Sequence, residues 1–442
     1  MPDHDHGPSM NAASADYDAV VVGASLAGCA TAIELGRAGL RVALVEKQPD
    51  PAAFKRICTH FIQASAVPTL ERLDLMDPIM AAGGLRCGLR MWTRWGWIEM
   101  PAGEENHGGA VNLRREVLDP LVRGVAAETP GVELLLGRTV HAVVRDGAAV
   151  AGVVVRERGG GEATLRGRLV VGADGRDSRV VELAGVRERI RPHNRFAYGA
   201  YFEGPGPEGA PDGSAWILDP QWAAAFPTDG GLTFYAAMPT KARLAEFKRD
   251  PEEALVSFVA DLPDAPPIRD CTRVSPVLGK LDMPNRIRAV TAPGLALVGD
   301  AALATDPLFG VGCGWAFQSA EWLAESVSPA LTGAEPLERG LERYAKRHAR
   351  QLRGHAWLIH DYATGRKFNA SERLLFAAAA RDRRAAALFD AFGTRRVGPA
   401  QAFPRLLPRA LMVNARHRLA RRGAAEAPAA SGAAAAAEAV GA

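Results

Sequence analysis

The stretch from Asp16 to about Glu46 constrains the fold of this chain more than any other part of its sequence. A short apolar strand, Val20 to Val22, leads directly into a turn, Gly23 to Gly28, and then into a helix that ends before Gly39. A second apolar strand follows and ends on Glu46. This order of strand, glycine-containing turn, helix and strand predicts a dinucleotide-binding βαβ unit, and therefore an α/β fold.

We expect the turn to hold the pyrophosphate of a nucleotide. Gly23 permits the tight turn, and Gly28 lets the helix pack closely against the strand. The helix begins at Leu26 and Ala27, where free N–H groups and a partial positive charge suit a phosphate. Glu46 falls where a carboxylate accepts hydrogen bonds from ribose hydroxyls.

Ser25 stands where this motif usually has its middle glycine, so its side chain slightly hinders approach of the backbone to a phosphate. The alternative interpretation is a plain tight turn between a strand and a helix. Because both strands, the helix and the acidic residue follow in register, we favour nucleotide binding.

Length and composition narrow the class of protein. The 442 residues suffice for a large core and for more than one subdomain. No uncharged apolar run reaches the roughly 18 residues that span a bilayer, so we expect no integral membrane segment. Residues 1–15 lack the basic start and apolar centre of a signal peptide and are predicted to be a disordered leader. Five dispersed cysteines without metal-ligand spacing indicate reduced thiols in a cytoplasmic protein, and no metal site.

Positive charge is concentrated near the C-terminus. Residues 339–422 hold 20 lysines and arginines against 5 aspartates and glutamates, whereas the whole chain has a net charge of +3. Such a surplus can attract an anionic cofactor, a membrane surface or nucleic acid. Because no nucleic-acid motif accompanies it, we favour a solvated helical face packed against an acidic body, and expect no nucleic-acid partner. The alanine-rich end, residues 423–442, is predicted to be disordered.

The middle of the chain predicts a second, antiparallel sheet. From about Phe196 to Leu281, alternating aromatic-rich strands surround one helix, and we expect them to form a wall for a small apolar or aromatic ligand. Residues 85–101 add tryptophan-rich strand pairs. The pattern beyond Glu335 predicts helices over residues 336–362, 371–392 and 404–421.

Further motifs follow the first turn in a fixed order. They are Arg115-x-x-Leu118, Gly172-Ala-Asp174-Gly175, Val298-Gly-Asp300-Ala-Ala and Pro307-x-x-Gly310-x-Gly312. With the glycine turn, this order resembles the FAD-dependent monooxygenases of the para-hydroxybenzoate hydroxylase type. That superfamily also holds geranylgeranyl reductases, flavin-dependent halogenases and tailoring enzymes of bacterial natural-product pathways, including antibiotic biosynthesis. The resemblance covers residues 16 to about 335.

The resemblance implies a Rossmann-like FAD-binding domain with an inserted antiparallel-sheet substrate domain and a C-terminal helical extension. We expect the FAD-binding domain over residues 16–84, 102–190 and 285–335, the substrate domain over 85–101 and 191–284, and the helical region over 336–422.

The resemblance also implies roles for residues near the flavin. Asp300 is expected to accept hydrogen bonds from the ribityl chain. Gly310, Gly312 and the helix N-terminus after them would present N–H groups to the pyrimidine edge of the ring, where reduced flavin carries negative charge. Pro307 keeps this loop rigid. Arg115 resembles an arginine that reaches the cofactor with its planar fork, and a surface salt bridge is the alternative.

Other expected cofactor contacts are more dispersed. Val140 resembles the position whose backbone meets the adenine. Asp174 resembles an acid near the pyrophosphate that serves FAD and NAD(P)H together, and capping of a turn is the alternative. Lys47, Arg56 and Cys313 complete the predicted FAD contacts.

The loop beside the ring departs from the family pattern. Leu303 stands where many relatives have histidine, which suggests a less polar wall, and Trp315 brings an indole close to the flavin face. Cys313 could act as a redox thiol, but no partner cysteine lies at disulfide-exchange spacing in the sequence. We therefore favour packing of a small residue at this position.

The leading hypothesis is an NAD(P)H- and O2-dependent flavin monooxygenase. Non-covalent FAD would be reduced by hydride, and a C4a-hydroperoxyflavin would hydroxylate or epoxidise an aromatic or polyketide-like secondary metabolite. NAD(P)H would bind transiently, because no second glycine fingerprint occurs. No general base is identified. The residues that qualify by type alone are His60, Tyr198, Tyr201 and Tyr235.

Alternative reactions remain open at this point. A geranylgeranyl-reductase-like saturase is suggested by Lys55-Arg-Ile-Cys58, although Thr59 replaces the glycine of that family. A non-redox, FAD-dependent cyclase would use the same fold. A halogenase is disfavoured, because Ile98 directly follows Trp97 and breaks the tryptophan motif. The oligomeric state and the choice between NADH and NADPH stay undetermined.

Overall fold

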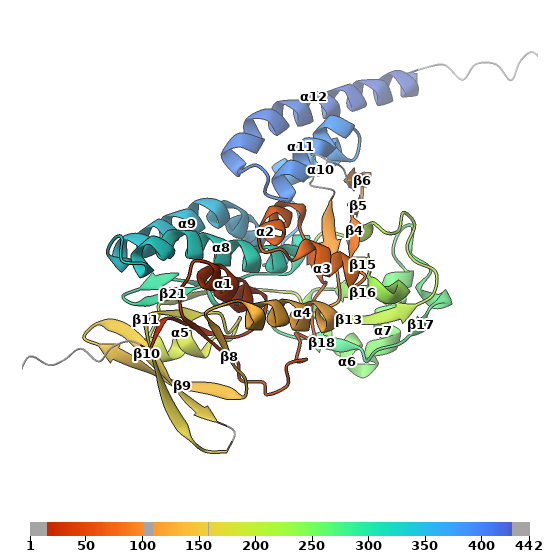
Figure 1. Ribbon diagram of the computed structural model, residues 1–442. Coiled ribbons are helices and arrows are strands. Elements are labelled where there is room, and N and C mark those ends of the chain that lie inside the picture. Colours follow the sequence, from red (N-terminus) through yellow and green to blue (C-terminus); the bar gives the residue numbers. More distant parts are fainter. Residues whose placement is uncertain (1–15, 101–108, 158, 427–442) are drawn as a thin grey trace, which may run out of the picture.

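The computed structural model describes residues 16–100, 109–157 and 159–426 (Figure 1). The predicted leader, residues 1–15, lies outside the described residues, as does the part of the predicted tail after residue 426. Residues 423–426 of that tail belong to helix α12, Pro399–Glu426. Within the described ranges, no helix combines the length and the apolar character that crossing a membrane requires.

A mostly parallel sheet forms the centre of the nucleotide-binding part and confirms the predicted α/β class. Its order is β20-β21-β11-β1-β2-β8, with β9 and β10 joined through β11, and β1 pairs in parallel with both β2 and β11. Ala19 and Val21 face the core that contains α1 and α8, whereas Val20 and Val22 face β9 and β10. The strands are β1 Tyr17–Val22, β2 Val42–Val45, β8 Val132–Leu135, β9 Arg138–Asp146, β10 Ala149–Glu157, β11 Glu162–Gly172, β20 Thr291–Ala292 and β21 Leu295–Leu297.

Helices cover this sheet and short segments join it to the second sheet. In Figure 1, α1, α8 and α9, Leu337–Tyr362, form a layer beside the central sheet, and α4 lies next to α1. The helices of this part are α1 Leu26–Arg37, α2 Val67–Arg72, α3 Met76–Ala81, α4 Arg115–Glu128, α5 Arg179–Ala184 and α8 Val311–Leu331. Two small sheets comprise β3 Phe61–Ile62, β4 Leu85–Cys87 and β7 Ala110–Asn112, and β12 Glu188–Arg191, β19 Asn285–Arg288 and β22 Leu303–Ala304.

The second large sheet has the order β17-β13-β16-β15-β14-β5-β6, with β18 beside β13. Alternation along each strand gives it two apolar faces. One face packs against α6 and α7, and the other packs against the C-terminal helices. Its elements are β5 Leu89–Thr93, β6 Gly96–Met100, β13 Ala197–Glu203, β14 Gly213–Ile217, β15 Trp222–Pro227, β16 Leu232–Met238, β17 Thr272–Arg273, β18 Leu278–Lys280, α6 Leu244–Arg249 and α7 Pro251–Ala260.

The C-terminal extension is helical, but it is more divided than the sequence predicts. Helix α9, Leu337–Tyr362, packs on α8, and α10 to α12 form the separate blue layer of Figure 1. The single helix expected over 371–392 is wrong, because α10, Ala370–Ala379, and α11, Arg383–Gly393, are two helices. Asp382 starts the second one: its carboxylate accepts the N–H of Ala385 at 2.8 Å and pairs with Arg409.

Candidate functional site

The glycine turn has the geometry that its two glycines predict. Gly23 adopts φ +103°, and a Cβ there would lie 2.6 Å from the carbonyl oxygen of Ala173. A Cβ on Gly28 would lie 1.8 Å from the carbonyl oxygen of Gly23. Helix α1 starts directly after Ser25, and no side chain caps its first turn. The N–H groups at Leu26 and after it are therefore available to an anion, and the turn fits a nucleotide pyrophosphate.

Glu46 closes the turn from the end of β2. One carboxylate oxygen accepts the N–H of Ala24 at 2.9 Å, and the other accepts the N–H of Gln48 at 2.9 Å. Each oxygen keeps a further lone pair, so binding of a ribose hydroxyl is compatible with these contacts and stays a prediction.

Arg115 lies inside the site rather than on the surface. Its side chain is 3% exposed, so the alternative of a surface salt bridge is wrong. Nε donates to Asp119 at 2.8 Å, and Nη2 donates to the Ser25 hydroxyl at 2.7 Å. Asp119 also accepts the backbone N–H of Lys55, at 2.8 Å. The arginine thus joins α4, the glycine turn and the 55–60 segment at one point.

Asp300 lies opposite this arginine, in a 3-10 turn, η6 Gly299–Ala301, that follows β21. Its Oδ2 lies 3.1 Å from Nζ of Lys55, which the sequence analysis did not place in the cofactor site. Burial tends to raise the pKa of Asp300, but Lys55 and Arg176 more than offset this and the pKa is lowered. The carboxylate is therefore charged and accepts hydrogen bonds at neutral pH.

The predicted flavin-ring loop forms a second 3-10 turn, η7 Leu308–Gly310, immediately before α8. Gly310 has φ +62°, and a Cβ there would approach the ring of Phe61 to 2.8 Å. A Cβ on Gly312 would meet no atom within 4 Å. The backbone of the first turn of α8 is therefore open to a flat group, and this space fits a flavin ring.

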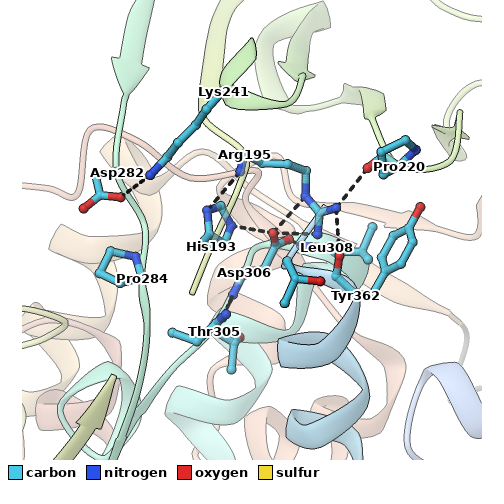
Figure 2. Close-up of polar contacts among 12 residues, drawn as sticks. His193, Arg195, Pro220, Lys241, Asp282, Pro284, Thr305, Asp306, Leu308 and Tyr362 are labelled. Carbon is cyan, nitrogen blue, oxygen red and sulfur yellow. Dashed lines mark hydrogen bonds and ion pairs between the residues drawn. The ribbon is translucent and has the colours of Figure 1, made fainter. Parts of the chain in front are cut away.

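A buried ionic cluster holds the loop in place (Figure 2). Asp306, directly before Pro307, accepts hydrogen bonds from Arg195 Nε at 3.0 Å and Nη2 at 2.9 Å. His193 Nε2 lies 2.6 Å from the same oxygen, Oδ2, and the other oxygen accepts the N–H of Leu308 at 2.8 Å. Burial opposes the charge of Asp306, but Arg195 and His193 more than offset it, so the pKa is lowered. Arg195 also donates to the carbonyl of Tyr362, which ties the loop to α9. We regard Arg195 and Asp306 as positioning residues.

Cys58 and Cys313 meet beside this loop. Their sulfur atoms lie 3.6 Å apart, so the expectation that Cys313 has no partner cysteine is wrong. The sequence hides this pair because 255 residues separate the two positions. The hydrogen bond from Cys313, followed by the charges of Arg115 and Lys55, holds the pKa of the Cys58 thiol well below its ordinary value. The same hydrogen bond and burial raise the pKa of Cys313.

His60 and Tyr201 form a polar pair that joins the 55–60 segment to strand β13 of the second sheet. His60 Nδ1 accepts the backbone N–H of Arg115 at 3.0 Å, so Nε2 carries the proton and donates to the Tyr201 hydroxyl, 2.5 Å away. Burial lowers the pKa of His60 to about 4 and raises that of Tyr201, so both side chains are neutral at pH 7. Tyr198 and Tyr235 instead belong to the core on the opposite face of the sheet.

The other predicted residues take more peripheral places. Asp174 accepts the N–H groups of Arg179 at 2.7 Å and Val180 at 3.1 Å, which is the capping role named as its alternative. Its predicted role near the pyrophosphate is untested. Val140 is buried on β9, whereas Lys47 and Arg56 are exposed. These three stay predictions as cofactor contacts.

A small cavity of about 40 Å³ lies between the second sheet and the C-terminal helices. Phe61, Gln63 and Met91 line one side, and Phe389 of α11 lines the other. Arg395, just after α11, donates to Gln318 of α8 and stacks over Trp315, with the guanidinium carbon 5.5 Å from the ring centre. Phe389 and Arg395 could not be found from the sequence, because the resemblance ends near residue 335 and no motif marks them.

Comparison with known proteins agrees with this geometry. Residues 16–356 match the family described as "FAD binding domain". The digeranylgeranylglycerophospholipid reductase of Methanosarcina mazei is 27% identical over 354 residues, which cover 77% of this chain and 82% of that protein. The kynurenine 3-monooxygenase of Salinispora arenicola is 28% identical over 340 residues, which cover 70% and 72%.

Solved structures share the fold. The flavin-dependent brominase Bmp2 has a TM-score of 0.74 at 18% identity, covering 92% of this chain and 99% of the brominase. PqsL, a probable FAD-dependent monooxygenase from Pseudomonas aeruginosa, has a TM-score of 0.64 at 22% identity, covering 84% and 98%.

Proposed function

This chain belongs to the FAD-binding-domain family and is an FAD-dependent oxidoreductase, and from that premise we propose that it is a monooxygenase that uses NAD(P)H and O2. The proposed substrate is a small aromatic or polyketide-like molecule that is hydroxylated or epoxidised. Bound FAD would supply the redox chemistry, and the protein would orient the substrate and exclude water.

One observation carries this proposal: the open turn of α8 adjoins an enclosed, aromatic substrate side. Phe61 contacts the loop at Gly310 and also belongs to the apolar cluster that α10 and α11 cover. An apolar or aromatic ligand in that cluster would lie next to the space in front of Gly312. Oxygen transfer needs a contact between substrate and cofactor from which water is excluded, because water would otherwise decompose the reactive intermediate.

The polar groups around this space have distinct proposed roles. Glu46, Arg115 and Asp300 would hold the cofactor through its ribose, pyrophosphate and ribityl oxygens. Tyr201 accepts a hydrogen bond from His60, so its own O–H is left to donate to a substrate oxygen. Because both side chains are neutral, we assign them orientation of the substrate rather than removal of a proton.

A second candidate, a saturase that transfers hydride to an alkene, is favoured by a specific observation. Lys55 and Cys58, which carry the resemblance to geranylgeranyl reductases, lie at Asp300 and Cys313 inside the site. The relatives named as digeranylgeranylglycerophospholipid reductases also cover most of this chain. Such a reaction would need reduced flavin but no oxygen.

The test is anaerobic stopped-flow absorbance of the FAD-loaded protein mixed with NADH or NADPH, followed by a pulse of ¹⁸O2 with candidate aromatic substrates. A monooxygenase should bleach the flavin band and then yield a product containing ¹⁸O. Bleaching with a product that gains two hydrogens without oxygen would replace the proposal by the saturase. If neither nucleotide bleaches the flavin, the proposal that NAD(P)H reduces it directly fails, and the non-redox cyclase or a separate reductase partner takes its place.

A further inference from the structure

A second, larger pocket lies away from the glycine turn, between one face of α9 and the small sheet β12-β19-β22. It encloses about 650 Å³, within the range of small-molecule sites. Residues spaced along α9 from Ala345 to Asp361 form one wall. Strand residues form the other, and Ala302 and Leu303 also line the pocket. Those two residues lie between Asp300 and the flavin-ring loop, yet none of Gly23 to Gly28 lines this pocket.

Three arginines of this pocket carry unbalanced charge. Arg189 and Arg191 extend from β12 and Arg353 from α9, and all three are exposed. Within the described part of the chain, none of the three guanidinium groups has a hydrogen bond or an ion pair. The fourth arginine, Arg288, is different, since it pairs with Glu188 at 2.7 Å. The acidic lining residue, Asp361, pairs with Arg366.

Two buried histidines add hydrogen-bonding capacity without charge. His348 and His360 are 6% and 7% exposed, and both line the pocket. Nε2 of His360 has no hydrogen-bond partner among the described residues. Burial lowers the pKa of both rings to about 4, so they are neutral at pH 7 and can donate to a ligand oxygen. A buried imidazole nitrogen without a hydrogen-bond partner lowers the stability of the fold unless a ligand or water forms a hydrogen bond with it.

The same pocket offers an aromatic surface. Trp357 is 64% exposed, the second most exposed of the large apolar side chains in the described chain, and it lies one helical turn from Arg353. Leu352 and Ala356 form an apolar floor below it. A flat ring can stack on the indole while its charged substituent reaches the arginines.

From this arrangement we propose that the pocket binds a nucleotide, with its phosphates at Arg189, Arg191 and Arg353 and its base on Trp357. The base accounts for the exposed indole beside an apolar floor, and the phosphates account for three cations without a counterion. The proposal is independent of the reaction that the flavin performs. Free adenosine nucleotides and nicotinamide dinucleotides share this chemistry, and the experiment separates them.

The test measures binding to the FAD-loaded protein, so that the cofactor site is already filled. ADP and NADP⁺ are titrated separately by isothermal titration calorimetry at low and high salt. The variants are Arg353→Ala, Arg189→Ala with Arg191→Ala, and Trp357→Ala. The matched control is Arg350→Ala, which removes an exposed arginine of α9 that does not line the pocket.

Saturable binding that weakens at least fivefold in each pocket variant, but not in Arg350→Ala, supports the proposal. Tighter binding of ADP identifies an adenosine nucleotide as the ligand, and tighter binding of NADP⁺ identifies a dinucleotide. If neither ADP nor NADP⁺ binds saturably, the proposal is overturned. The proposal is also overturned if the pocket variants bind the nucleotide as tightly as the wild type does, because the nucleotide then binds outside this pocket. Neither result depends on whether NADPH reduces the flavin.

Discussion

Asp306→Asn tests whether the buried ionic cluster holds the flavin-ring loop. The amide has nearly the shape of the carboxylate but removes the charge that faces Arg195 and His193. The asparagine side chain can keep one acceptor for Arg195, so packing should change little. Arg195 is fully buried and would remain charged without a counterion.

The magnitude follows from what Asp306 contacts. It accepts two hydrogen bonds from Arg195, at 2.9 and 3.0 Å, and one from Leu308. Removing one partner of a buried ion pair costs about 3–5 kcal/mol, because the other charge is left buried. We therefore expect the free energy of unfolding at pH 7 to fall by about 3–5 kcal/mol. The double variant Arg195→Met with Asp306→Asn should be less destabilised than the two single changes added together.

The assay is equilibrium urea unfolding of the FAD-saturated protein, followed by circular dichroism. Asp282→Asn is the control: Asp282 pairs with Lys241 at 2.7 Å on the surface, and exposed pairs contribute about 0–1 kcal/mol (Figure 2). Because the folded pKa of Asp306 is lowered, its contribution is complete above the unfolded pKa of about 3.9. It is lost as the pH falls below that value, so wild type and Asp306→Asn should converge in acid. A loss no larger than that of Asp282→Asn would refute the reasoning.

Three other changes test the cofactor side. Glu46→Ala should weaken FAD binding by about 1.5–3 kcal/mol, the range for a hydrogen bond to a charged group, and an unchanged dissociation constant would show that Glu46 does not bind the ribose. Asp300→Ala should yield purified protein without FAD, whereas a stoichiometric flavin spectrum would contradict its role. In cofactor-free protein, Cys58 should be alkylated by iodoacetamide well below the usual thiol pKa of about 8.5, as measured by mass spectrometry across pH. Buried Cys29, whose pKa is raised to about 12, is the control, and equal rates at neutral pH would oppose the thiolate assignment.

Local sequence patterns predicted the structure correctly wherever one segment determines its own geometry. The turn at Gly23 and Gly28 is an example, because the φ of Gly23, +103°, and the close contact of Gly28 with the carbonyl oxygen of Gly23 both arise within the turn. The order of motifs likewise indicated the α/β fold and the family. Single residues in those motifs were harder to assign: Asp174 caps α5 in the structure, and a carboxylate beside a helix N-terminus suits that role as well as a ligand.

Contacts across long sequence separations could not be predicted. Cys58 meets Cys313, and His60 meets Tyr201, only because α8 and β13 bring distant segments together. Neither pair has a spacing that a pattern could reveal. Lys55 was likewise assigned to a reductase-like motif, and its ion pair with Asp300 emerged from the fold alone.

The C-terminal helices show why the substrate side is the least predictable part. Their basic residues were interpreted as a solvated face, and several do pair locally, such as Arg409 with Asp382. Phe389 nevertheless lines the cavity beside Phe61, and Arg395 reaches α8 at Gln318. A helix that closes a cavity needs only an apolar stripe of suitable shape, and a stripe of this kind is common to any packed helix. We therefore expect substrate choice to depend on residues that carry no motif, and variants of Phe389 should change substrate preference before they change FAD binding.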